Sequence, residues 1–143
     1  MQIEENLGEF FGAGGALEKC LQGFAPRPEQ LAMAQEIADA IQTGHHLVIE
    51  AGTGTGKTLA YLVPALLSGQ QVIISTGTRT LQDQLFHRDL PTIGSALGRP
   101  VTVQLLKGRS NYLCLYRLDG IDNAFEDQKY LAGEIRRLKE WAS

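Results

Sequence analysis

The stretch AGTGTGKT, residues 51–58, combines glycines with a lysine and a threonine at a spacing that can hold phosphate. It departs from the pattern G-x-x-x-x-G-K-[ST] at Ala51, which stands where the first glycine should be. Backbone N–H groups around the glycines and the N-terminus of a following helix form a concave anion site. The sequence therefore predicts a nucleotide-binding loop, formed by Gly52, Thr53, Gly54, Thr55, Gly56, Lys57 and Thr58.

Lys57 and Thr58 are the residues of this loop whose side chains suit chemistry. In such a loop the lysine ammonium reaches the β- and γ-phosphates of a nucleotide, and the threonine hydroxyl ligates Mg²⁺. A glycine-rich turn that merely links a strand to a helix would need neither side chain. We therefore predict ATP and Mg²⁺ as cofactors, and this pair as the catalytic residues.

Hydrolysis of ATP requires two further groups that the sequence does not supply. Enzymes with such a loop hold Mg²⁺ with a carboxylate at the end of another strand, and they position the attacking water with a further residue. No apolar run of the chain ends in an aspartate, and no arginine can be assigned to the transferred phosphate. We expect the chain to hold ATP and, on its own, not to hydrolyse it.

The elements that position the loop follow from the hydrophobic pattern. Residues 25–44 carry apolar residues at helical spacing, with Pro28 suited to the first turn and Gly44 to the end. Short apolar, β-branched runs predict three buried strands, at residues 46–51, 71–76 and 101–106. Because helical segments alternate with these runs, the sequence predicts an α/β fold with a doubly wound parallel sheet.

Composition and charge narrow the class of protein. The chain has 143 residues, 43% of them hydrophobic, and a net charge of −3, so any nucleic-acid site must be local. No apolar run approaches the ~18 residues of a membrane span, and the acidic N-terminus is unlike a signal peptide. Cys20 and Cys114 do not have the spacing of a disulfide framework. We expect a cytoplasmic protein with no membrane partner.

Four stretches of the chain stand in the order found at the N-terminus of DinG–XPD-type iron–sulfur helicases: FAPRPEQLAMAQEIADAI, VIEAGTGTGKTLAYLVPAL, VIISTGTRTLQDQLFHRDLP and LLKGRSNYLC. The chain resembles this family over roughly residues 10–118, and most of all its bacterial DinG/YoaA-like branch. The resemblance implies a P-loop NTPase with a RecA-like sheet, here an incomplete first motor domain. It also implies three parts: an N-terminal extension (1–23), the first half of motor domain 1 (24–106), and the truncated start of an iron–sulfur insert (107–143).

The resemblance implies that Arg27 and Gln30 belong to the element that reads adenine upstream of the loop. A glutamine amide offers one donor and one acceptor, which match the edge of adenine. From the helical pattern alone, Gln30 is also consistent with a solvated helix residue.

The segment STGTRTLQDQL resembles the part of these helicases that touches single-stranded DNA. The residues implied are Thr76, Thr78, Arg79 and Thr80. Hydroxyl groups, an arginine and a helix N-terminus suit contacts to phosphate that do not depend on base sequence. The alternative is that Thr78 or Thr80 is the N-cap of the next helix.

In this family the cysteine of a segment such as GRSNYLC is the first of four ligands to a [4Fe–4S] cluster. A cluster needs four thiolates and the chain has two cysteines, so we predict Cys114 to be an orphan ligand, with the cluster present only in a full-length parent. The alternative is a small buried hydrophobe. Lys107 and Arg109, near Tyr112 and Tyr116, suit binding of single-stranded DNA or a solvated, partly packed loop.

The resemblance implies that the chain is the ATP-binding N-terminal part of an ATP-dependent 5′-to-3′ DNA helicase that acts on single-stranded or damaged DNA, as in DNA repair. The part alone is expected to be inactive. Because half a sheet presents an unpaired apolar edge, we also expect self-association or a bound partner. Two alternatives stay open: a small P-loop phosphotransferase, and a non-catalytic ATP-binding regulatory module.

Overall fold

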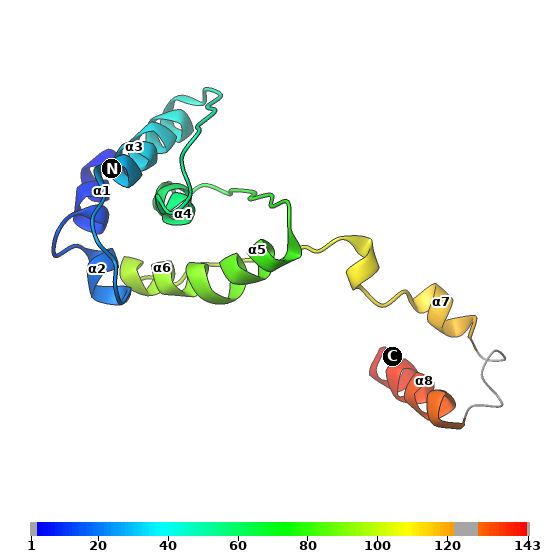
Figure 1. The fold of residues 1–143 in the computed structure, drawn as a ribbon. Coiled ribbons are helices and arrows are strands. Elements are labelled where there is room, and N and C mark those ends of the chain that lie inside the picture. Colours follow the sequence, from blue (N-terminus) through cyan, green and yellow to red (C-terminus); the bar gives the residue numbers. More distant parts are fainter. Residues whose placement is uncertain (1–2, 122–128, 143) are drawn as a thin grey trace. The chain divides into compact units, whose positions relative to one another are not determined.

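The computed structural model describes residues 3–121 and 129–142. The chain divides into two compact units, Met1–Val103 and Gln104–Ser143, each of which is described by itself (Figure 1). Within the described residues, no helix is long and apolar enough to cross a membrane.

The first unit is built from helices joined by irregular segments (Figure 1). Its elements in chain order are α1 Ile3–Phe11, α2 Ala16–Cys20, α3 Pro28–Thr43, α4 Lys57–Leu67, α5 Arg79–Gln84, the π-helical turn η1 Leu85–Asp89 and α6 Leu90–Leu97. The last three elements follow one another without a break, so residues 79–97 form one long helical stretch that contains a wider turn.

The helix predicted upstream of the loop is confirmed as α3. It begins at Pro28, whose fixed φ suits a first helical position. It ends at Gly44, which has a left-handed φ of 71° and donates its N–H to the carbonyl of Ala40 at 2.9 Å. Both ends of α3 are therefore set by the residues that predicted them.

The core of the first unit lies between helices. α3 packs against α4 and α1, and α2 packs against α6. The fully or almost fully buried apolar residues are Leu7, Phe10, Phe11, Leu17, Ala34, Ala38, Ala60, Leu62, Val63, Leu85 and Ile93. The two helices of the predicted N-terminal extension thus contribute large side chains to the same core as α3 and α4.

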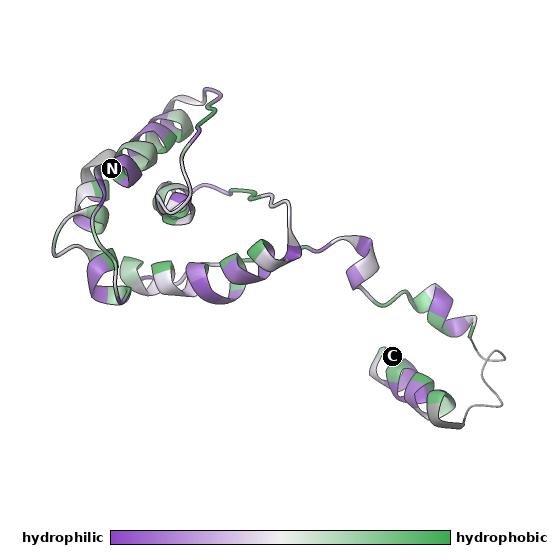
Figure 2. Cartoon of the chain, viewed as in Figure 1, coloured by the Kyte–Doolittle hydropathy of each residue, from purple (hydrophilic) through white to green (hydrophobic). Residues whose placement is uncertain are grey.

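The described residues contain no strand, so the three predicted strands are not found: residues 46–51, 71–76 and 101–106 are irregular. Figure 2 shows hydrophobic residues in the irregular segment between α4 and α5. Val48 is 97% exposed, Ile73 92% and Leu106 82%. A strand needs a neighbour for its backbone N–H and C=O groups. The apolar pattern predicts a segment that would be buried in a sheet, but it does not supply that neighbour.

The second unit contains the 3₁₀ turn η2 Arg109–Asn111 and the helices α7 Leu115–Asp119 and α8 Lys129–Ala142. α7 packs against α8, and Leu118 is the buried apolar residue of this pair. Most other large side chains described here are exposed, Tyr116 and Trp141 among them.

Candidate nucleotide-binding site

The predicted phosphate loop leads directly into α4, as the sequence pattern requires. Gly54 and Gly56 both have a φ of 81°, a left-handed conformation that costs glycine little and other residues more. Gly56 is the N-cap of α4, and its carbonyl accepts the N–H of Ala60 at 3.2 Å. The first N–H groups of α4 have no partner within the helix, so they are available to an anion.

Lys57, the first residue of α4, folds back over the loop. Its Nζ donates to the carbonyl of Ala51 at 2.7 Å and to that of Gly52 at 3.2 Å. The Gly52 carbonyl also accepts the hydroxyl of Thr55 at 3.0 Å. Lys57 is exposed, so a phosphate could replace the two carbonyls as the partner of its ammonium.

Thr58 lies one residue further into α4 and is half-buried. Its side chain forms a hydrogen bond with Tyr61. Burial raises the pKa of Tyr61, the hydrogen bond with Thr58 lowers it, and the charge of Asp89 adds to the rise. The hydroxyl of Thr58 is therefore held in place from within the helix that begins at the loop.

Arg27 and Gln30 are brought to the loop from the start of α3. Arg27 Nη1 donates to the carbonyl of Gly54 at 2.6 Å, and Gln30 Nε2 donates to that of Gly56 at 2.9 Å. Gln30 is only 2% exposed, so it is a buried residue and not a solvated one. The structure thus places both residues against the loop, while their predicted contact with adenine stays a prediction.

The predicted DNA-contact residues lie around the start of α5. Thr78 is the N-cap of this helix, because its hydroxyl accepts the N–H of Leu81 at 3.2 Å. The hydroxyl of Thr76 donates to the carbonyl of Thr78 at 3.3 Å. Arg79 and Thr80 are exposed in the first turn. The N-cap alternative is confirmed for Thr78, and the DNA contact of the four residues stays a prediction.

The remaining predicted site residues lie in the second unit. Lys107 and Arg109 are on or next to η2, and the hydroxyl of Tyr112 accepts the backbone N–H of Lys107 at 2.8 Å. Cys114 is a free, exposed thiol immediately before α7, so the alternative of a buried hydrophobe is wrong. Among the described residues there is no group of three or more His, Cys, Asp or Glu side chains that could hold a metal. The two cysteines of the chain do not fit a [4Fe–4S] cluster, and no role is assigned to one here.

Asp89 is a buried carboxylate that the sequence pattern did not single out. It is 9% exposed at the end of η1 and accepts from Gln84 Nε2 and Arg88 Nε, both at 2.9 Å. Turns of π-helix often occur at functional sites. An aspartate inside an amphipathic helix looks solvated in sequence, so only the packing of η1 reveals its burial.

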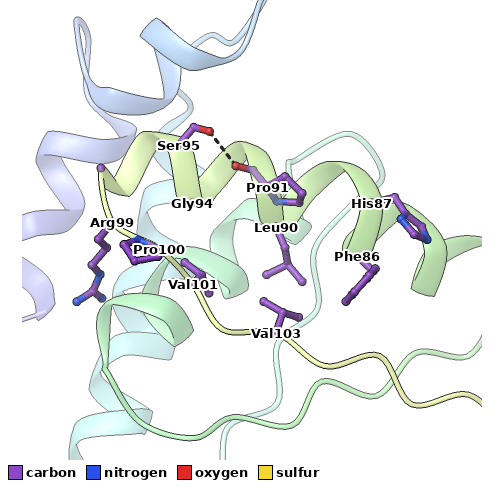
Figure 3. Close-up of a pocket in the computed structure, with 11 residues that line it drawn as sticks. Phe86, His87, Leu90, Pro91, Gly94, Ser95, Arg99, Pro100, Val101 and Val103 are labelled. Atoms are coloured by element: carbon purple, nitrogen blue, oxygen red, sulfur yellow. Dashed lines mark hydrogen bonds between the residues drawn. The ribbon is translucent and has the colours of Figure 1, made fainter.

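An open pocket of about 730 Å³ lies between the η1–α6 stretch and the segment that follows it. Figure 3 shows Leu90 and Val103 pointing toward one another across this space. Arg99 also lines the pocket, but its guanidinium binds a residue outside the lining: Nη2 donates to the carbonyl of Leu66 at 2.7 Å. No residue of the phosphate loop or of α3 lines the pocket, so it is separate from the candidate nucleotide site.

Comparison with known proteins shows which family carries this loop. Residues 28–132 match the DEAD/DEAH box helicase family. The chain is 50% identical to the ATP-dependent DNA helicase YoaA of Haemophilus influenzae over 143 residues, which cover 99% of this chain and 22% of that protein. It is 58% identical to the YoaA of Escherichia coli over 134 residues, 93% of this chain and 21% of that protein.

More distant relatives bear the name DinG. The chain is 41% identical to the ATP-dependent helicase DinG of Mycobacterium tuberculosis, over 85% of this chain and 22% of that protein. It is 42% identical to the 3'-5' exonuclease DinG of Bacillus subtilis, over 80% of this chain and 13% of that protein. No solved structure matches the chain.

The chain spans about a fifth of the length of the YoaA relatives. The family resemblance read from the four ordered stretches is confirmed by these matches, since they cover the loop and the segments on both sides of it. The chain belongs to the DEAD/DEAH box helicase family and is homologous to the YoaA and DinG ATP-dependent DNA helicases.

Proposed function

We propose that this chain is the ATP-binding part of an ATP-dependent DNA helicase. The observation that carries the proposal is the phosphate loop: Gly56 caps α4 in a left-handed conformation, and the ammonium of Lys57 donates to the backbone carbonyls of Ala51 and Gly52 in the loop. Such a loop gives an anion backbone N–H donors, a helix N-terminus and a mobile positive charge.

The proposal gives a role to two residues of the loop and to two residues beside it. Lys57 leaves the carbonyls of Ala51 and Gly52 and binds the β- and γ-phosphates. Thr58 gives its hydroxyl to Mg²⁺, which neutralises phosphate charge when bound. Arg27 and Gln30, both beside the loop, contact the adenine end. The chain alone is proposed to bind ATP without hydrolysing it, because none of its apolar runs ends in an aspartate that could hold Mg²⁺.

The DNA-binding part of the proposal rests on the exposed first turn of α5. Thr76, Thr78, Arg79 and Thr80 would contact the phosphates of single-stranded DNA. Lys107 and Arg109, in the second unit, are proposed as separate contacts to single-stranded DNA. We propose 5′-to-3′ movement, action on damaged DNA, a cytoplasmic location and a cluster bound through Cys114 only for a longer protein that contains this sequence.

The expected RecA-like sheet is also part of the proposal. The segments 46–51, 71–76 and 101–106 carry exposed apolar residues such as Val48 and Ile73. Further parallel strands would bury these residues on both faces, as parallel sheets require. A longer chain would supply such strands, and a second copy of this chain would be a substitute for them.

A titration of the chain with ATP and Mg²⁺ tests the nucleotide site. Lys57→Ala should weaken ATP binding by about tenfold or more, because a charge-assisted hydrogen bond to phosphate is lost. Lys19→Ala is the matched control, since Lys19 is an exposed lysine on α2 outside the loop. Unchanged affinity in Lys57→Ala, or equal loss in both variants, would contradict the proposal.

A further inference from the structure

We infer that Gln30 is a positioning residue of the phosphate loop. Its side-chain amide holds the carbonyl of Gly56, and so orients the backbone donors of the loop toward phosphate whatever base the nucleotide carries. The inference rests on the proposed nucleotide site and adds to the adenine contact proposed for the same residue.

The contact between Gln30 and the loop is buried. Nε2 donates to the Gly56 carbonyl at 2.9 Å across 26 residues of sequence, and Gln30 is 2% exposed. Its other polar atom, Oε1, is buried without a hydrogen-bond partner among the described residues. Water cannot take over the bond from Nε2 at such a site, and a buried group that loses its partner is costly. The donor atom of the amide, Nε2, is thus committed to the loop, while Oε1 has no partner in the loop.

The geometry of Gly56 shows what the contact controls. In a planar trans peptide the C=O of one residue and the N–H of the next point in opposite directions. A donor that fixes the Gly56 carbonyl therefore also fixes the N–H of Lys57, which lies in the same peptide plane and points in the opposite direction. The Gly56 carbonyl also accepts the N–H of Ala60, so Gln30 acts on the peptide that starts α4.

Gln30 and Gly56 also fit each other sterically. A Cβ added at Gly56 would clash with Nε2 of Gln30, so the buried amide occupies the space that a larger residue would need. Gly56 has a φ of 81°, which already favours glycine. Two separate requirements, the left-handed φ and the closeness of Gln30, thus meet at the residue that caps the helix.

Arg27 provides a second and weaker example of the same arrangement. Its Nη1 donates to the Gly54 carbonyl at 2.6 Å, which by the same rule orients the N–H of Thr55. Arg27 is exposed, so water competes for the bond. The positioning role therefore falls mainly on Gln30.

The test uses the full chain and three probes: inorganic tripolyphosphate, which has no base, ATP and GTP, each with Mg²⁺. Gln30→Met keeps the volume of the side chain and removes its hydrogen-bonding groups. We expect the affinity for tripolyphosphate to fall by about three- to tenfold, which is the loss of one hydrogen bond. The affinity of Gln30→Met for ATP should fall by at least the same factor. The ratio of ATP to GTP affinity then measures the adenine contact separately.

Stability distinguishes positioning from a general structural role. Because Gln30→Met also removes the buried, unpartnered Oε1, its thermal unfolding temperature should be unchanged or higher while its phosphate affinity is lower. Gln35→Met is the matched control, an exposed glutamine on the same helix, and should change neither quantity. If Gln30→Met does not fold, Gln30→Leu fills the site with a different shape and carries the same expectation.

The outcomes separate the inference from the proposed function. If Gln30→Met binds tripolyphosphate as tightly as the unmodified chain, the inference is overturned, even where ATP binding is weaker. If the unmodified chain binds none of the three probes, the proposed nucleotide site itself fails and the inference falls with it. Loss of tripolyphosphate affinity without loss of stability supports the inference.

Discussion

The phosphate loop and two apolar segments of the first unit, residues 46–51 and 71–76, lie near one another in sequence but differ in whether the chain supplies the partners that they need. The loop satisfies its polar groups with neighbours that the chain itself supplies: Arg27, Gln30 and Lys57 all donate to its carbonyls. The apolar segments leave Val48 and Ile73 almost fully exposed. The comparison teaches that a binding loop can be organised by helices alone, whereas a sheet needs strands that pair with one another.

The largest expected effect separates the helical core from the apolar segments. Leu62→Ala, on α4, should lower the free energy of unfolding by about 2–5 kcal/mol, because it leaves a cavity in a fully buried site. At a protein concentration low enough for the chain to be monomeric, Ile73→Ala should change it by less than about 0.5 kcal/mol, because Ile73 is 92% exposed in the single chain. Urea unfolding of both variants provides the measurement. A large loss in Ile73→Ala would show that its segment is packed in solution, and the contrast would be lost.

The second effect concerns what the apolar segments do when no strand pairs with them. The chain should self-associate through these segments, and the double variant Val48→Lys/Ile73→Lys should raise the dissociation constant by about 100-fold or more, because two apolar side chains that are exposed in the single chain would be buried in the associated form. Sedimentation equilibrium measures this constant. Gln70→Lys, at an exposed polar residue, is the control for added charge. A chain that stays monomeric at all concentrations would contradict the prediction.

The smallest effect tests whether Tyr61, on α4, is buried in solution. Burial raises the pKa of Tyr61, so the folded state binds its proton more tightly than the unfolded chain does. The stability that this provides is fully present below the ordinary tyrosine pKa of about 10 and is lost as the pH rises through the folded-state pKa. Unfolding free energies measured from about pH 9 to about pH 11 should therefore fall more steeply in the unmodified chain than in Tyr61→Phe. Parallel pH profiles would show that Tyr61 is solvated.

The loop could be predicted from the sequence because its requirements are local. Glycines at positions of positive φ, then a lysine and a helix, are encoded within eight residues. The start of α3 at Pro28 and its end at Gly44 are local signals of the same kind. The family was also readable, because four short motifs stand in a fixed order.

The parts that were missed depend on contacts between distant residues. The family resemblance implies an adenine contact for Gln30, but its bond to Gly56 spans 26 residues and depends on how α3 packs against α4. Asp89 has the sequence context of a solvated residue and is buried by the turn of η1. The three apolar runs predicted strands from side-chain type alone, and side-chain type does not specify which segment pairs with which.

The packing of α2 against α6 has a consequence for how the protein is made. Ala16–Cys20 leaves the ribosome long before Leu90–Leu97 does, so Leu17 has no complete core to enter while the chain between them is synthesised. At about 5–20 residues per second, this interval lasts several seconds. During it, the part of α2 that packs against α6 is open to chaperones and to neighbouring nascent chains. Synthesis of α6 therefore ends the period in which this part of α2 is exposed to misassembly.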